Sequence, residues 1–309
     1  MSSGGSSGSR ARGLAGVRSA DPSFVSTHRD FSGASWRLKH AWAKQHFEHL
    51  EQHLRVYLSR NPYGVRRRHR GKPNPYAYSF ALDVLEQPDD KASLIFGDVV
   101  HNLRSALDHL AVALTPCRSN RIAFPIEIAN IWETDDSGNF VSNDDEARER
   151  YLANVKDMSF EVLALLESLQ PYHGRLATPH PGLRPDQERE LHPLRILALL
   201  DNADKHRKLV RLQFAMMGVV SLMFVRGQAI GVWPSPHAYD GAEVVYRPFP
   251  PKETPPESEV EVRVFGTNIV SVEIGLKDAM IPVLDNLRMV IERIPLDVFD
   301  VLEDHVLDE

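Results

Sequence analysis

Residues 97–110 read GDVVHNLRSALDHL and place short polar side chains among apolar ones at helical spacing. At 100° per residue, the polar side chains share one arc of a helix and the apolar side chains share the opposite side. The arc contains Asp98, His101, Asn102, Ser105, Asp108 and His109, with Arg104 at its edge. A solvated helix face usually carries long charged side chains, whereas these shorter groups can bind a ligand, a metal, a phosphate or one another. The pattern predicts a polar site inside a helical bundle.

A second polar cluster occupies residues 201–208, which read DNADKHRK. Asn202 and His206 are one helical turn apart beside apolar neighbours, and a buried Asn or His needs a hydrogen-bond partner. The Asp and Lys residues of this stretch can also form ordinary intrahelical ion pairs. We expect the two clusters to meet in one pocket. The second cluster would contribute Asn202, Asp204, Lys205, His206 and Arg207.

Five short sequence motifs, which we call words, occur along the chain in this order: GDxxHNLRSALDHL, FPI, LQPY, HPL and NxDKHR. Together they resemble a family of uncharacterised bacterial proteins that is frequent in actinobacteria. The resemblance covers roughly residues 36–213. It implies that the words belong to one structure, and the family has no assigned activity from which a reaction would follow.

Arg104 and His109 carry a second resemblance, to HEPN domains, which are helical bundles and in many cases metal-independent ribonucleases. Their motif is Arg, four to six residues, then His on a helix, although Ser105 stands where HEPN proteins favour Asn, Asp or His. The resemblance implies that His109 accepts the proton of an RNA 2′-hydroxyl while Arg104 holds the phosphate. No metal or other cofactor would be required. The candidate catalytic residues are Arg104, His109 and His206, and the candidate binding residues are Asp98, His101, Asn102, Asn202, Asp204, Lys205 and Arg207.

RNA is the partner that this hypothesis implies, and a homodimer is a second possible partner. Arg104 and His109 project about 140° apart on an ideal helix. Either the Arg104 side chain curls round the helix, or a second subunit completes the site.

Two alternatives remain open for the same residues. Asp98 and His101 have the one-turn spacing at which two side chains can share a metal ion, with further ligands from other histidines. Alternatively, the polar residues around 98–104 pair with those around 202–206 and only fix how two helices dock, because buried polar networks specify packing. The protein would then be a non-catalytic interaction or structural module.

Composition limits the classes of function. The 309 residues carry a net charge of −6, which gives no general attraction to nucleic acid or to an anionic membrane. The one cysteine, Cys117, excludes an intramolecular disulfide and favours a reducing compartment, so we expect a cytoplasmic protein. The sequence has no run of about 18 apolar residues and no signal-peptide core at its start, so we expect no membrane association.

Two further sets of residues could support a site. The run RRRHRGK at 66–72, in an expected loop over 60–75, could grip phosphates while nearby tyrosines stack on bases, or it could be a solvated loop. His46, His49 and His53 lie on one side of the expected first helix. They could be surface residues, or they could line the same polar interior as His101.

The period of the apolar residues predicts the elements that position these groups. Helices are expected at 34–59, 91–115, 144–156, 158–170, 192–208 and 276–293, with Pro282 as a kink or as the true start of the last one. An extended segment is expected at 76–84, and strands are expected at 209–217, 219–225, 228–233, 243–248, 258–265 and 268–274.

The expected fold is mainly α, a helical bundle with a smaller antiparallel β-sheet inserted before the C-terminal helix, and α+β overall. Residues 1–32 are rich in Ser, Gly and Arg and are expected to be disordered. Residues 33–294 would form a single helical-bundle domain with the β insertion at about 209–275, and residues 295–309 an acidic tail.

Overall fold

The computed structural model describes eight stretches of the chain. They are residues 34–68, 76–115, 122–127, 130–132, 145–173, 192–206, 211–273 and 280–306, without the side chains of 204–206, 273 and 280–282. The chain divides into two units after Gly33, and all the described residues belong to the second unit. In these stretches, no helix is both long enough and apolar enough to cross a membrane.

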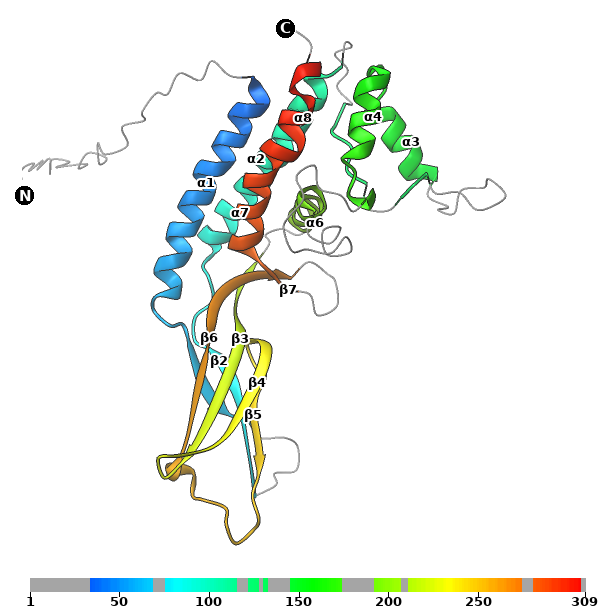
Figure 1. Ribbon diagram of the computed structural model, residues 1–309. Coiled ribbons are helices and arrows are strands. Elements are labelled where there is room, and N and C mark those ends of the chain that lie inside the picture. The colour runs from blue at the N-terminus through cyan, green and yellow to red at the C-terminus, as the bar shows by residue number, and fades with distance from the viewer. Residues whose placement is uncertain are drawn as a thin grey trace, which may run out of the picture. The chain divides into compact units, whose positions relative to one another are not determined.

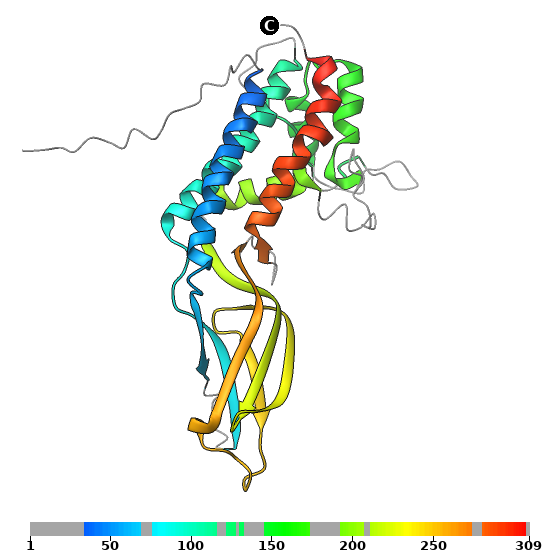
Figure 2. The same cartoon turned by 60° about the vertical axis from the view of Figure 1, so that its left-hand side comes forward.

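Three long helices form the centre of the helical part. These are α1 (Ser35–Leu58), α2 (Asp90–Ala113) and α7 (Val283–Ile294), and both views show them side by side (Figures 1 and 2). Their apolar stripes face one another, so that Leu50 and Leu54 of α1 and Leu103 of α2 are completely buried. Helix α2 begins where the sequence predicts, because the side chain of Asp89 accepts a hydrogen bond from the Ala92 amide at 2.9 Å.

Shorter helices surround this centre: α3 (Asp145–Asn154), α4 (Phe160–Ser168) and α6 (Pro193–His206), with the 3-10 turn η1 (Pro171–His173) after α4. Helix α7 starts directly after Pro282 and continues through the π-helical turn η3 (Pro295–Phe299), α8 (Asp300–Leu302) and the 3-10 turn η4 (Glu303–His305). Phe299 is buried, and its ring lies 4.8 Å from that of Trp36. The start of the expected acidic tail is therefore part of the core.

Two antiparallel sheets make up the β part. The first has the order β1-β2-β5 and consists of β1 (Tyr63–Arg67), β2 (Ala77–Val84) and β5 (Glu243–Pro248). The second has the order β4-β3-β6-β7 and consists of β4 (Gln228–Tyr239), β3 (Leu212–Val225), β6 (Val260–Glu273) and β7 (Met280–Pro282); the short turn η2 (Glu257–Glu259) precedes β6. Inner side chains of both sheets, such as Phe80 and Met223, belong to the same core as the helices.

The expected fold class is confirmed, with three corrections to its detail. The single expected sheet is two sheets, and the first contains strands from before α2. The expected loop at 60–75 contains β1, because Val65 packs against the core while Arg66 pairs with Asp83 across the strands at 3.1 Å. The strands expected at 209–217 and 219–225 are one strand, as are those expected at 258–265 and 268–274.

A β-bulge explains why the long strands look like pairs of short ones. The pairing of β3 with β6 shifts between Met217 and Val220, where Gly218 has a φ of +58°. The bulge reverses which residues face inward, so the apolar alternation of the sequence is interrupted without an end of the strand.

The start of β3 is attached to the start of α2. The Leu212 amide donates to Ser93 Oγ at 3.3 Å, and the Phe214 amide donates to Gln87 Oε1 at 3.0 Å. The Phe214 ring also stacks on Tyr63 with centroids 5.6 Å apart. The sheets are thus joined to the bundle through hydrogen bonds as well as through the core.

Candidate functional site

The polar arc of α2 divides into an outer and an inner set of side chains. Asp98, His101 and His109 are exposed. Arg104 and Asp108 are partly buried, with 18% and 34% of their side-chain surface exposed. The expected single polar face is therefore two faces with different surroundings.

The inner set holds the main chain of Phe124. Arg104 Nη2 donates to the Phe124 carbonyl oxygen at 2.8 Å, and the Phe124 amide donates to Asp108 Oδ1 at 3.0 Å. Arg104 and Asp108 are one helical turn apart and pair with each other at 3.1 Å. Because residues 122–127 form no regular ladder, these two side chains supply the hydrogen bonds that a neighbouring strand would otherwise give. We call this arrangement the Phe124 clamp.

Gln170 of the LQPY word holds the same segment from another side. Its side chain is fully buried and lies at the end of α4. The Glu127 amide donates to Gln170 Oε1 at 2.8 Å, while Gln170 Nε2 donates to the carbonyl oxygens of Pro125 at 3.2 Å and Leu166 at 2.9 Å. The FPI segment is thus fixed between α2 and α4 by polar side chains.

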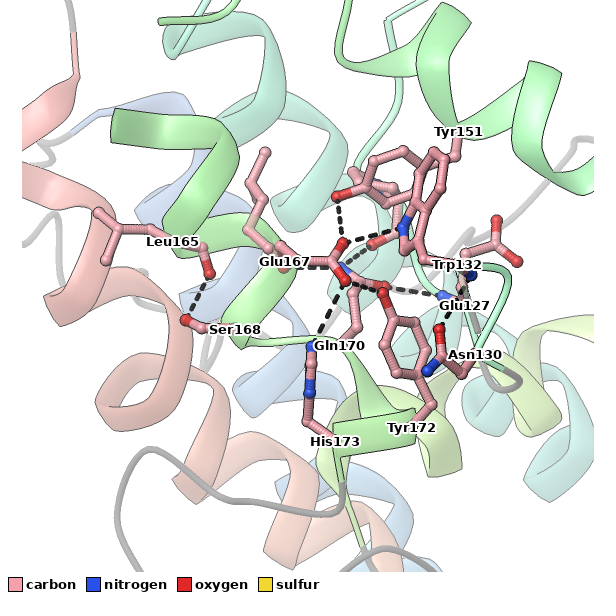
Figure 3. A network of polar contacts seen from close by, with 12 residues as sticks. Glu127, Asn130, Trp132, Tyr151, Leu165, Glu167, Ser168, Gln170, Tyr172 and His173 are labelled. Atoms are coloured by element: carbon pink, nitrogen blue, oxygen red, sulfur yellow. Dashed lines mark hydrogen bonds and ion pairs between the residues drawn. The ribbon is translucent and has the colours of Figure 1, made fainter. Parts of the chain in front are cut away.

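The Glu167 carboxylate collects several donors beside Gln170 (Figure 3). Trp132 Nε1 and the Tyr151 hydroxyl donate to Oε2, each at 3.2 Å, and the Tyr172 hydroxyl donates to Oε1. His173 Nε2 lies 3.4 Å from Oε1, and its ring is 4.7 Å from that of Tyr172. These residues come from α3, α4, η1 and the segment after Phe124, so one carboxylate connects four parts of the chain.

The electrostatics of this cluster favour a fixed network over reactive phenols. Burial raises the pKa of both Tyr151 and Tyr172 above the ordinary value of 10.0, and the hydrogen bond to Glu167 and the charge of Glu167 raise it further. Both hydroxyls therefore stay protonated and remain donors at neutral pH. His173 is the exposed member of the cluster.

The expected pocket between residues near 100 and residues near 204 is not formed by the described side chains. Helices α2 and α6 are in contact, but Asn102 Nδ2 donates to the Asp98 carbonyl oxygen at 2.8 Å, and Lys39 Nζ donates to Asn102 Oδ1 at 3.5 Å. Asn202 is exposed. Asp204, Lys205 and His206 lie in α6 but their side chains are outside the description, as is all of Arg207.

One buried and one half-buried histidine bear directly on stability. His192, of the HPL word, is 2% exposed, and its Nδ1 accepts from the Leu194 amide at 3.3 Å. Burial, reinforced by the charge of Arg293, lowers the pKa of His192 to about 4. His40 donates through Nε2 to the Ile291 carbonyl oxygen at 2.8 Å, and burial lowers its pKa. Both imidazoles are therefore neutral at physiological pH.

The histidines of α1 do not share an interior with His101. His49 is exposed, and His46 is half-buried against the exposed Trp42, with rings 5.3 Å apart. His53 Nε2 lies 2.8 Å from Asp89 Oδ1, beside a cavity of about 80 Å³ whose lining includes Tyr57. Such a cavity holds a few water molecules and is too small for a nucleotide.

The described arginines of the basic run all bind groups of the protein itself, and two of them pair with acidic side chains. Arg67 pairs with Glu257 and lies 4.6 Å from the centre of the Tyr78 ring, and Arg68 donates to the Gly241 carbonyl oxygen at 2.9 Å. With the Arg66 pair on the neighbouring strand, these contacts reduce the positive field that a phosphate would meet. Residues 69–75 lie outside the described residues.

The described residues provide no set of ligands for the metal-binding alternative. Within them, no three His, Cys, Asp or Glu side chains lie close enough together to hold a metal ion. Asp98 and His101 keep their one-turn spacing, and both face solvent.

Sequence reasoning missed the residues that hold the segment after Phe124. Gln170 and Glu167 end an apolar helix, and their polarity next to Pro171 was the available signal. Trp132 and Tyr151 gave no signal, because aromatic residues are common in cores.

Comparisons with protein-family models, with curated proteins and with solved structures found no match to this chain.

Proposed function

We propose that this chain is a non-catalytic interaction module in which the polar words of the sequence organise the fold. The observation that carries the proposal is the Phe124 clamp, in which Arg104 donates to the carbonyl oxygen and Asp108 accepts from the amide of a single residue. A side chain with this role is held in place by its contacts and is poorly placed to move toward a substrate. The cysteine count makes a cytoplasmic location part of the same proposal.

The hydrogen bonds of Gln170 and Glu167 support the same proposal. Gln170 makes three hydrogen bonds to main-chain groups, and Glu167 receives its donors from side chains of three other elements. Buried polar networks of this kind specify one packing of a core. The words FPI, LQPY and LRSALD then occur together because they contact one another.

The second candidate function is an RNA-directed one, a HEPN-like endoribonuclease that uses Arg104 and His109. The observation in its favour is that His109 is exposed on α2, about one and a half turns from Arg104. The side chain of Arg104 is 18% exposed. Under this hypothesis His109 accepts the 2′-hydroxyl proton and Arg104 contributes its remaining N–H groups to the phosphate.

One assay separates the two candidates. Purified protein is incubated with single-stranded and structured RNA, with and without EDTA, and compared with His109→Ala and Arg104→Ala. The interaction module leaves the RNA intact under every condition. Cleavage that persists in EDTA and disappears with His109→Ala overturns the proposal in favour of the ribonuclease. His109→Ala is decisive because an exposed side chain can be removed without loss of the fold.

A further inference from the structure

The outer face of the four-stranded sheet carries apolar side chains that the core does not use. Met217, Val220, Val232 and Phe265 are exposed by 43%, 37%, 61% and 52%. Leu222 and Phe224 lie on the same side of β3 as Val220 and are outside the core cluster of the described residues. An antiparallel sheet with one solvated face normally presents polar residues there.

The strand register places these residues in one continuous patch. Val220 lies opposite Phe265 of β6 and Pro234 of β4, and Leu222 lies opposite Val232 and Arg263. Residues directly opposite on neighbouring strands share a face of the sheet. The inward neighbours Val219, Ser221 and Met223 are completely or almost completely buried, which fixes the direction of the alternation. We call the outward set Met217, Val220, Leu222, Phe224, Val232 and Phe265 the outer sheet face.

One charge of each sign lies on this face. Arg263 Nε pairs with Glu261 Oε1 at 2.6 Å, and the Arg263 guanidinium lies 4.7 Å from the centre of the Phe224 ring. In a two-fold pair of such faces, Arg263 of each copy can lie opposite Glu261 of the other copy. The whole chain has a net charge of −6, which would oppose association of two copies through an acidic face, whereas this neutral face avoids that repulsion.

We propose that the outer sheet face binds the outer sheet face of a second copy of this chain. The inference rests on the proposed interaction function and names its partner. In such a pair the two faces stack as the layers of a β-sandwich do, about 10 Å apart. Arg263 and Glu261 of each copy then meet the opposite charges of the other copy at the rim of the apolar contact.

The size of the face sets the strength of the association. Three strands spaced about 4.8 Å apart and eight residues of about 3.3 Å each give about 400 Å² per copy. Stable interfaces bury about 800 Å² on each partner, so this smaller face is of the size of a weak, transient interface. Such a dimer is present at high protein concentration and dissociates on dilution.

The test is sedimentation analysis of the full chain between 5 and 500 μM. We expect a concentration-dependent dimer. Phe265→Glu should weaken it by at least tenfold, whereas Phe160→Glu, the same change at an 85% exposed position of α4, should leave it unchanged. If Phe265→Glu changes the circular dichroism spectrum, the double variant Val220→Thr/Val232→Thr is tested in its place, because threonine keeps the β-branched shape of valine. Val112→Thr on α2 is the control for this double variant.

A charge exchange shows whether the occupant is a second copy. Arg263→Glu and Glu261→Arg each give the face two like charges, so each variant alone should associate at least tenfold more weakly than the native chain. An equimolar mixture of the two variants should associate at least as well as the native chain, because the faces then carry opposite charge.

A native chain that is monomeric at 500 μM overturns the proposal, and so does a dimer that Phe265→Glu leaves intact. Neither result affects the proposed function, which fails only if RNA is cleaved in the separate assay.

Discussion

The polar residues around Phe124 and the apolar residues of the outer sheet face differ in how completely the fold uses them. Arg104, Asp108 and Gln170 all have hydrogen-bond partners inside the molecule. Val232 and Phe265 keep more than half of their surface exposed. The comparison teaches that part of a conspicuous polar motif can be engaged in folding, while apolar side chains in a region without any motif stay exposed.

Gln170 gives the strongest test of the first half of this comparison. Gln170→Ala leaves the Glu127 amide and the Pro125 carbonyl without the partners that they now have, inside the core. We expect a loss of about 3 kcal/mol in the free energy of unfolding, since each unsatisfied buried group costs about 1–3 kcal/mol. Urea unfolding measures it, with Gln52→Ala on the exposed side of α1 as the control. Equal effects of the two substitutions would contradict the assigned role.

The pH dependence of the free energy of unfolding tests whether His192 is shielded from water in the folded protein. The unfolded imidazole of His192 binds a proton near its ordinary pKa of 6.5, whereas the folded imidazole does so only near a pKa of about 4. Between these pH values the unfolded state binds more protons, so stability is complete above pH 6.5 and is lost as the pH falls toward 4.

The expected loss over that range is about 3 kcal/mol, from about 1.4 kcal/mol per pKa unit. Urea midpoints at pH 7.5, 6.0, 5.0 and 4.0 measure it. His192→Gln should remove this part of the slope of unfolding free energy against pH. The contributions of His40 and of the carboxylates should remain. An unchanged slope in the variant would show that the pKa of His192 is the same in the folded and unfolded states.

The Arg104–Asp108 pair should show a coupling that an exposed pair does not. A double-mutant cycle with Arg104→Ala and Asp108→Ala is expected to give about 1 kcal/mol or more, because both side chains share the Phe124 main chain. The cross-strand pair Arg66–Asp83, with 57% of the arginine exposed, should give about 0.5 kcal/mol or less. Indistinguishable couplings would mean that the clamp is an ordinary surface ion pair.

The smallest effects are expected where the fold makes no use of the side chain. His109→Ala and Val232→Thr should each change the free energy of unfolding by about 0.5 kcal/mol or less, since both residues are exposed. Thermal unfolding at low protein concentration, where association is negligible, measures this. A loss above about 1.5 kcal/mol for Val232→Thr would place that residue in the core and remove the contrast.

Much of the fold could be predicted from local signals. Helix α2 was expected at 91–115 and extends over Asp90–Ala113, because the Pro-Asp-Asp start and Pro116 limit it. Strand β4 was expected to end at 233, but it continues to Tyr239 through Pro234 and Pro236. These prolines are tolerated because β4 is an edge strand and is paired only with β3 in the described sheet.

The candidate site was less predictable, for a physical reason. The arc of α2 correctly indicated that short polar groups need partners, but the partner of Arg104 and Asp108 is the main chain of Phe124. A backbone amide and carbonyl occur at almost every position, so the residue types of the sequence do not indicate which of them are hydrogen-bond partners. The sequence therefore favoured side-chain partners near 202–206. For the same reason Gln170 was noticed only as the neighbour of a proline.

The attachment of β3 to the first turn of α2 and to the residues just before it has a consequence for how the molecule opens. Ser93 and Gln87 bind amides that lie 119 and 127 positions away along the chain. Breaking these bonds exposes the beginning of the central strand and the beginning of a central helix at the same moment. Bundle and sheets should therefore lose their protection against hydrogen exchange together, as one cooperative unit with a high contact order.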